Sequence, residues 1–206
     1  MPEETTTGRL SPAVEDYLKA IYKLQQSGEP AATSDVAEAL GISAASVTGM
    51  ARRLTEMGLA RHEPYKGTAL TEAGKRVALE VIRHHRLLEL YLKEVMDYSW
   101  AELHDEAERL EHHISEEFES KLDELLGHPT RDPHGHPIPT REGEMDEVGT
   151  DRLADVEPGQ QVVVCHLLDD DPSLLAHLED RGLMPGAVLD VADRLDYVAE
   201  MGFDVL

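Results

Sequence analysis

The N-terminal third of the chain carries three short amphipathic helical patterns in succession. In each one, apolar residues recur every three or four positions, which is the spacing of a helix with one buried face. Ser11 and Pro12 suit the start of the first helix, because serine caps helix N-termini and proline is tolerated in the first turn. The predicted helices span residues 12–27, 33–40 and 44–57.

A hairpin pattern and a longer helical region follow. Two short extended runs over residues 59–70 flank Tyr65-Lys66-Gly67-Thr68, a sequence typical of a β-hairpin tip. Helical spacing resumes at Thr71 and predicts one long helix. Two shorter helices are predicted over residues 100–112 and 115–126.

The composition and the hydrophobic pattern both change in the last third of the chain. Residues 127–149 are rich in proline and glycine, which predicts a linker. Beyond it, apolar runs over residues 162–168 and 188–191 predict strands around one short helix, residues 172–180. A strand-like pattern reaches Leu206, which suggests an incomplete, small β-rich domain. We therefore expect a mostly α fold with small β parts.

Composition excludes several classes of protein. No apolar run approaches the ~20 residues that a membrane span needs, and the acidic N-terminus lacks the features of a signal peptide. The single cysteine, Cys165, can form neither an internal disulfide nor a cysteine-rich zinc finger. We therefore expect a cytoplasmic protein without a membrane partner.

Charge divides the chain into two regions. The whole chain has 19 Lys and Arg against 42 Asp and Glu, a net charge of −23. Residues 1–76 hold 9 basic and 10 acidic residues, whereas residues 77–206 hold 10 and 32. Within residues 43–83 the balance is positive, 7 against 4. A polyanion such as DNA would therefore meet the first region, and a cation would prefer the second.

The second and third predicted helices, separated by Gly41-Ile42-Ser43, form a helix-turn-helix pattern. The same pattern also fits a small helical domain without a nucleic-acid partner, but the hairpin that follows favours a winged helix. The outward face of the third helix carries small and hydroxyl side chains that can enter a major groove, and basic residues are available for phosphates. The candidate DNA-binding residues are Ser43, Ala45, Ser46, Thr48, Gly49, Arg52, Arg53 and Lys66.

Histidines and carboxylates recur at helical spacing in the acidic region. His85 and Glu89 share one helix face, and so do His104, Glu108 and Glu111, with His112 beside them. Such helices are commonly solvated faces, but imidazole and carboxylate ligands without thiolates also suit Mn²⁺ or Fe²⁺. Asp16 is a further carboxylate, and His134 and His136 form a weaker candidate pair in a loop. His84 and His113 lie off the helical stripes and are expected to face solvent.

Five segments within residues 13–139 resemble the diphtheria-toxin-repressor family of metal-dependent regulators, and its manganese-responsive members in particular. The matching segments are Val14-Glu15-Asp16-Tyr17-Leu18, Ser46-Val47-Thr48, His84 to Glu89, His104 to His113 and Pro133-His134-Gly135-His136-Pro137-Ile138-Pro139. Pro158-Gly159-Gln160 and Leu178 to Gly186 look like the SH3-like domain of its longer members.

The resemblance implies a homodimer with a primary metal site and an ancillary one. By matching position, the primary ligands are Asp16, Glu108, Glu111 and His112, and the ancillary ligands are His85, Glu89 and His104. Iron-responsive members have methionine and cysteine at the positions of Asp16 and Glu108, so oxygen ligands here favour manganese. The sequence departs from the family at Lys19, Ala45 and Gly49, and Asp169, Asp170 and Asp171 are only candidates for SH3-like-domain ligands.

The resemblance also divides the chain. Residues 1–76 are expected to form a winged helix-turn-helix DNA-binding domain, residues 77–140 a helical metal-binding and dimerisation domain, and residues 141–206 the linker and SH3-like domain. We expect a regulator that is not an enzyme, is activated by Mn²⁺ or by Fe²⁺, binds a palindromic operator in double-stranded DNA and represses metal-uptake genes. Two alternatives stay open: a metal-buffering or adaptor protein, and a metal-dependent hydrolase, although no nucleophile motif or phosphate loop supports the hydrolase.

Overall fold

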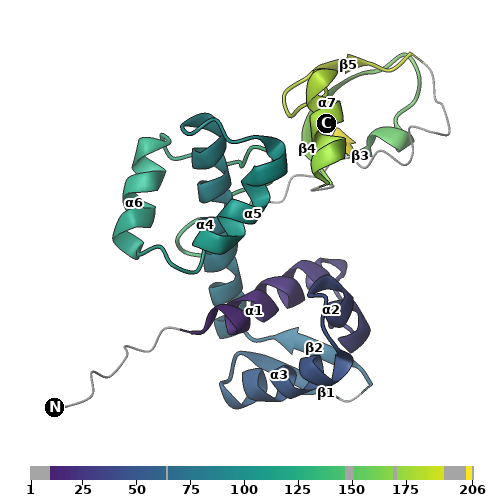
Figure 1. The fold of residues 1–206 in the computed structure, drawn as a ribbon. Coiled ribbons are helices and arrows are strands. Elements are labelled where there is room, and N and C mark those ends of the chain that lie inside the picture. The colour runs from purple at the N-terminus through teal and green to yellow at the C-terminus, as the bar shows by residue number, and fades with distance from the viewer. Residues whose placement is uncertain (1–9, 64, 147–150, 169–170, 193–202, 206) are drawn as a thin grey trace. The chain divides into compact units, whose positions relative to one another are not determined.

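The computed structural model of the chain describes residues 10–63, 65–146, 151–168, 171–192 and 203–205. The chain divides into two compact units, Met1–Ile82 and Arg83–Leu206 (Figure 1). Each unit has its own cluster of buried apolar side chains. The described residues are mostly helical, with one two-stranded and one four-stranded antiparallel sheet. The predicted mostly α fold with small β parts is therefore confirmed.

The first unit is a helix-turn-helix followed by a hairpin. Apolar residues at helical spacing bury one face of each helix, and the fully buried side chains include Val14, Leu18, Val36 and Leu54. The elements are α1 (Pro12–Leu24), the short 3-10 helix η1 (Gln25–Ser27), α2 (Thr33–Ala39), α3 (Ala44–Glu56), β1 (Ala60–Glu63), β2 (Gly67–Leu70) and the first part of α4 (Glu72–Glu94).

Local contacts hold α3 and the hairpin in place. Ser43 caps α3, because its Oγ accepts a hydrogen bond from the backbone nitrogen of Ser46 at 3.2 Å. Ala31 pairs with Thr68 through two backbone hydrogen bonds of 2.9 Å, so β2 has a partner on both sides. The hairpin is thus a wing attached to the helical core, as the sequence predicts.

The second unit combines helices with a small sheet. Its elements are the rest of α4, α5 (Trp100–Leu110), α6 (Glu116–Leu125), β3 (Asp151–Arg152), the 3-10 helix η2 (Leu153–Asp155), β4 (Gln161–Leu167), α7 (Pro172–Asp180), β5 (Val188–Asp190) and β6 (Phe203–Val205). The strands pair in the order β3-β6-β4-β5. One core cluster joins Leu87 and Leu103 of the helices to Leu167 and Leu175 of β4 and α7.

The segment predicted as a linker is more closely packed than its composition indicates. Its described part, residues 127–146, has no helix or strand, but Asp132, His134 and Ile138 are buried. Arginines of α4 hold it, since Arg83 Nη1 donates to the carbonyl of Pro139 at 2.9 Å and Arg86 Nη1 donates to that of Pro137. Buried backbone carbonyls require such donors, which a polar composition alone does not reveal.

Among the residues that the structure describes, no helix is both long enough and apolar enough to cross a membrane.

Candidate functional site

A cluster of buried imidazoles and carboxylates lies between α4 and α5. His85 and Glu89 are one turn apart on α4, and His85 Nε2 lies 3.0 Å from Glu89 Oε1. His104 of α5 places its Nδ1 3.2 Å from the same oxygen. The structure therefore brings together His85, Glu89 and His104, the three residues predicted for the ancillary site.

Glu89 is only 2% exposed, but its neighbours favour the ionised form of its carboxyl group. Burial alone would raise the pKa of this carboxyl group, but attraction to His85 and hydrogen bonds with His104, His134 and His85 hold its pKa well below the usual range. An ionised carboxylate surrounded by imidazoles is a strong donor set for a divalent cation.

The residues predicted for the primary site adjoin this cluster. Glu111, the C-cap of α5, is 1% exposed, and its Oε2 lies 2.5 Å from His85 Nδ1. Its Oε1 lies 3.4 Å from His112 Nε2. Glu108 is half exposed, with Oε1 3.7 Å from His104 Nε2. His85 thus faces Glu89 with one nitrogen and Glu111 with the other, so the candidate ligands of the second unit form one continuous cluster.

Asp16 lies on α1 in the first unit, where its side chain is half buried. Glu108, Glu111 and His112 lie in the second unit. The assignment of all four residues to one site remains a prediction.

The donor set fits a first-row divalent ion. The ligand atoms of His85, Glu89 and His104 all lie within 4.8 Å of one another, and so do those of His85, Glu108 and Glu111. All these donors are nitrogen or oxygen atoms, a combination that suits Mn²⁺ and Fe²⁺. Buried carboxylates at this spacing repel one another, so a bound dication would lower their electrostatic energy.

A third group, Asp132, His134 and His136, has its ligand atoms within 4.8 Å of one another. His134 Nδ1 also lies 3.5 Å from Glu89 Oε2, which connects this loop to the cluster between α4 and α5. His134 and His136 were only weak candidates from the sequence, because a spacing of two residues in a loop does not fix a common face. The sign that could have been used is the alternation of Asp132, His134 and His136 within a proline-bounded loop.

The structure shows the surroundings of His84 and Asp171, two residues considered in the sequence. His84 was expected to face solvent, and this is wrong, because it is 5% exposed. Helix α4 is covered on more than one side, so a residue outside the metal-facing stripe is still buried. Asp171 caps α7, with Oδ1 accepting from the backbone nitrogen of Leu174 at 2.8 Å. Asp169 and Asp170 lie outside the described residues.

The candidate nucleic-acid interface is the outer face of α3 together with the wing. All eight predicted residues are in the first unit: Ser43, Ala45, Ser46, Gly49, Arg52, Arg53 and Lys66 are exposed, and Thr48 is half buried. Thr48 Oγ1 donates to the carbonyl of Ala44 at 2.9 Å, so its hydroxyl group is already paired within α3. The short side chains allow a close approach of this helix to a base-pair edge.

The wing presents one basic and one aromatic residue. Lys66 Nζ forms an exposed ion pair with Glu63 Oε2 at 2.7 Å. This pairing lowers the pKa of Glu63 and raises that of Lys66, so both groups are charged at neutral pH. Tyr65 is fully exposed, with a positive φ of 66°. Tyr65 was not among the residues predicted to bind DNA, although its position at a hairpin tip was recognisable in the sequence.

Three family profiles match successive parts of the chain. The iron-dependent repressor N-terminal DNA-binding domain matches residues 9–68. The iron-dependent repressor metal-binding and dimerisation domain matches residues 71–140. The FeoA domain matches residues 152–204.

Comparisons with whole proteins also find metal-dependent repressors. The iron-dependent repressor IdeR of Mycobacterium tuberculosis is 35% identical over 189 residues, covering 86% of this chain and 82% of that protein. The diphtheria toxin repressor of Corynebacterium glutamicum is 29% identical over 196 residues, covering 91% of this chain and 84% of that protein. A solved manganese-dependent transcriptional repressor in complex with manganese has 33% identity and a TM-score of 0.84, covering 94% of this chain and 99% of that one.

Proposed function

The chain belongs to the iron-dependent repressor family, whose members are metal-dependent DNA-binding transcriptional regulators, and we propose that it is a repressor activated by Mn²⁺. Fe²⁺ is the second candidate metal, since the same nitrogen and oxygen ligands accept it. The genes that it controls are proposed to be those for metal uptake, and its place of action is the cytoplasm, where the DNA lies.

The observation that carries the proposal is the continuous His and Glu cluster of α4 and α5 in a chain that also holds a winged helix. Within it, Glu89 and Glu111 are almost completely buried and His85 lies between them. Buried carboxylates of this kind are uncommon unless a cation or a hydrogen-bond network compensates them. A purely solvated acidic helix would leave these groups in water.

The proposed activating site joins residues from both units. We assign to it Asp16 of α1 and, from the end of α5, Glu108, Glu111 and His112; His85, Glu89 and His104 form the second site. When bound, the cation supplies the positive charge that offsets repulsion among these carboxylates and links the two units. The apparent affinity for DNA then rises with the fraction of molecules in the binding-competent arrangement.

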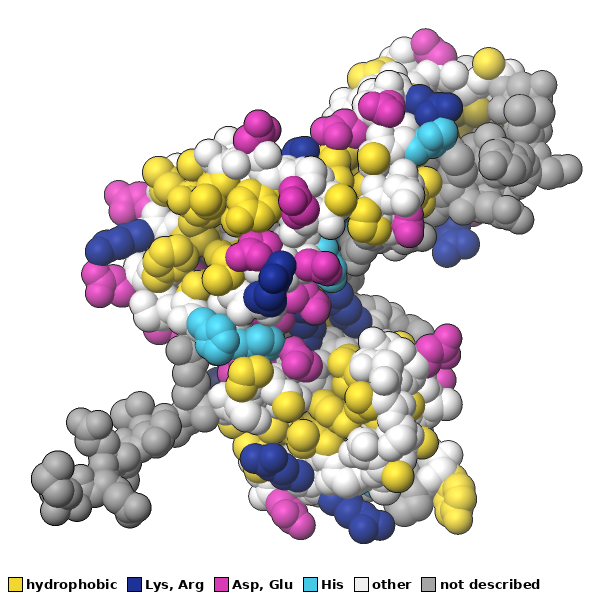
Figure 2. Space-filling view, viewed as in Figure 1, with side chains coloured by type: hydrophobic (Ala, Val, Ile, Leu, Met, Phe, Trp, Pro, Cys, Tyr) yellow, Lys and Arg dark blue, Asp and Glu magenta, His cyan; other side chains and the backbone are white. Residues whose placement is uncertain are grey.

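Dimerisation is proposed to occur through the helical part of the second unit. Val95 and Met96, directly after α4, and Phe118 and Leu125 of α6 are between 46% and 65% exposed. Figure 2 shows hydrophobic side chains gathered over this part of the molecule. Exposed apolar groups of this size are typical of interfaces, and they fall within the range that matches the dimerisation domain.

A dimer presents two copies of α3 to DNA. A two-fold symmetric pair of recognition helices fits a palindromic operator when the helices are about 34 Å apart, one turn of DNA. Because small side chains predominate on α3, we expect specificity to depend on shape, methyl contacts and the spacing of half-sites more than on many hydrogen bonds to bases.

A metal titration tests this function. Metal-free protein is titrated with Mn²⁺, Fe²⁺ or Mg²⁺, and its affinity for a palindromic fragment from its own upstream region is measured at fixed salt. The proposal predicts that Mn²⁺ strengthens DNA binding at lower concentration than Mg²⁺ does. Tight Mn²⁺ binding with no change in DNA affinity would instead favour a metal-buffering protein.

A further inference from the structure

The last turn of α5 is held by a side chain from α4. Carbonyl groups at a helix C-terminus lack partners within their own helix and need donors from elsewhere. The carbonyl oxygen of Glu111 accepts a hydrogen bond from His84 Nδ1 at 3.2 Å, which joins residues 27 positions apart in the chain. Because a carbonyl oxygen can only accept, His84 Nδ1 is the donor in this hydrogen bond. The bond fixes the peptide group between Glu111 and His112.

The other ring nitrogen of His84 faces a buried carboxylate. Its Nε2 lies 3.5 Å from Glu119 Oε2, and Glu119 Oε1 accepts a hydrogen bond from Arg83 Nε at 2.6 Å. His84, Glu119 and Arg83 are 5%, 3% and 7% exposed. Glu119 has few alternative positions, because moving it would break its buried hydrogen bond with Arg83.

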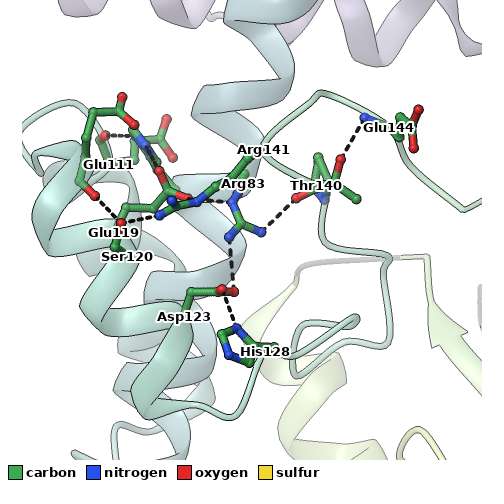
Figure 3. A network of polar contacts seen from close by, with 12 residues as sticks. Arg83, Glu111, Glu119, Ser120, Asp123, His128, Thr140, Arg141 and Glu144 are labelled. Carbon is green, nitrogen blue, oxygen red and sulfur yellow. Dashed lines mark hydrogen bonds and ion pairs between the residues drawn. The ribbon is translucent and has the colours of Figure 1, made fainter.

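Arg83 connects this chain to two further segments. Figure 3 shows Arg83 between Glu119 and Asp123 of α6 and the segment that carries Thr140. Its Nη2 lies 3.0 Å from Asp123 Oδ1, and its Nη1 donates to the carbonyl of Pro139 at 2.9 Å. The position of His84 is thus determined by α4, α6 and the 137–141 segment together.

We propose that His84 is a positioning residue for the metal site, holding the Glu111 peptide so that the side chains of Glu111 and His112 face the ion. The inference rests on the proposed assignment of Glu111 and His112 as ligands. His84 is not a ligand itself, since its two nitrogens face the Glu111 carbonyl and Glu119. Residues that orient metal ligands in this way commonly change metal affinity 10- to 100-fold when they are replaced.

The test measures Mn²⁺ affinity by calorimetry in full-length protein carrying His104→Ala, which removes one ligand of the second group. In this background, His84→Ala is expected to weaken Mn²⁺ binding about tenfold. His84→Asn keeps a donor near the position of Nδ1 and is expected to restore affinity to within about threefold. The matched control is His113→Ala, an exposed histidine two residues from Glu111, which should leave the affinity unchanged.

A second readout uses metal-free protein. The imidazole ¹⁵N shifts of His84 should show a proton on Nδ1 before any metal is added. If His84→Ala does not fold, as its melting curve would show, the comparison of His84→Asn with His84→Gln decides, because glutamine places its amide nearer the position of Nε2 and should bind Mn²⁺ more weakly.

The outcomes are distinct. Wild-type affinity in His84→Ala, or equal losses in the Asn and Gln variants, overturns the positioning role. Absence of Mn²⁺ binding in the unsubstituted protein overturns the proposed function instead.

Discussion

Glu119 shows how a single buried residue links stability to pH. Burial alone would raise the pKa of its carboxyl group, but hydrogen bonds with His84 and Arg83 and the charge of Arg83 lower it from 4.5 to about 2. The folded state therefore holds the ionised form more strongly than the unfolded chain does. The stabilisation is complete above pH 4.5 and is lost as the pH falls toward 2.

We therefore predict that Glu119→Gln lowers the free energy of unfolding at pH 7 by at most about 3 kcal/mol, and by less after solvent screening. The difference from the unsubstituted protein should shrink between pH 4.5 and pH 3. Urea unfolding at a series of pH values measures it. The control is Glu117→Gln, since Glu117 is 78% exposed and forms an ion pair with Lys121 at the surface. A difference that stays constant down to pH 3 would contradict the assignment.

Gly135 is a second residue whose identity is dictated by its surroundings. It has a positive φ of 87°, and a Cβ there would overlap the backbone carbonyl of Cys165 in β4. Nearby, the backbone nitrogen of Leu167 donates to the carbonyl of His134 at 2.9 Å. Glycine thus lets the histidine-bearing loop approach the edge of β4.

Gly135→Ala is predicted to lower the melting temperature more than Gly127→Ala does. Gly127 also has a positive φ, 75°, but a Cβ there would meet no atom within 4 Å. Both variants carry the backbone cost of about 1–2 kcal/mol for a left-handed conformation, and only Gly135→Ala adds the overlap with Cys165. Equal melting temperatures in thermal unfolding would show that the loop moves away from β4 without cost.

At the scale of elements, the helices and the hairpin followed from the sequence because each depends on local pattern. Ser43, Pro12 and the spacing of buried residues predicted the limits of α1 and α3 to within a few residues. The burial of the 127–146 segment could not be predicted from the sequence. It depends on contacts with Arg83 and Arg86, which are more than forty residues away in the chain.

The grouping of the candidate metal ligands was predictable from helical spacing only in part. His85 and Glu89, one turn apart, identified a helix face from spacing alone. The joining of the candidate ligands of the second unit through His85, and the contact of His134 with Glu89, require α4, α5 and the loop to be placed together. Residues such as His84 that act through the backbone have no pattern of their own in a single sequence.

The wing is the element whose contribution to DNA binding can be isolated. Lys66→Ala should reduce the slope of log affinity against log salt by about 1, because each phosphate contact releases roughly one counterion. Lys121→Ala, an exposed lysine of α6 in the second unit, makes the same change in charge and should leave the slope unaltered. Fluorescence anisotropy with saturating Mn²⁺ at several salt concentrations measures both variants. Equal slopes in the two variants would contradict a phosphate contact by the wing.

At the scale of the whole molecule, the regions proposed to bind DNA and to bind metal differ in net charge. The net charge of −23 is concentrated after residue 76, and the region with more basic than acidic residues includes α3 and the wing. Screening over about 8 Å at physiological salt allows the acidic region to coexist with DNA that is bound elsewhere. The same acidic surface raises the local concentration of cations near the metal cluster.

The central claim is that an aspartate of the DNA-binding unit and ligands of the helical unit bind one cation together. Asp16→Ala tests it most directly, because Asp16 lies on α1 and outside the candidate DNA contacts. The control is Glu29→Ala, an exposed acidic residue of the same unit. Affinity for the palindromic fragment is measured with and without Mn²⁺, and the molar mass of each variant is measured by light scattering.

The account predicts that Asp16→Ala remains dimeric and loses the strengthening of DNA binding by Mn²⁺, whereas Glu29→Ala retains it. Metal stimulation of the same size in Asp16→Ala and in the unsubstituted protein would contradict the account.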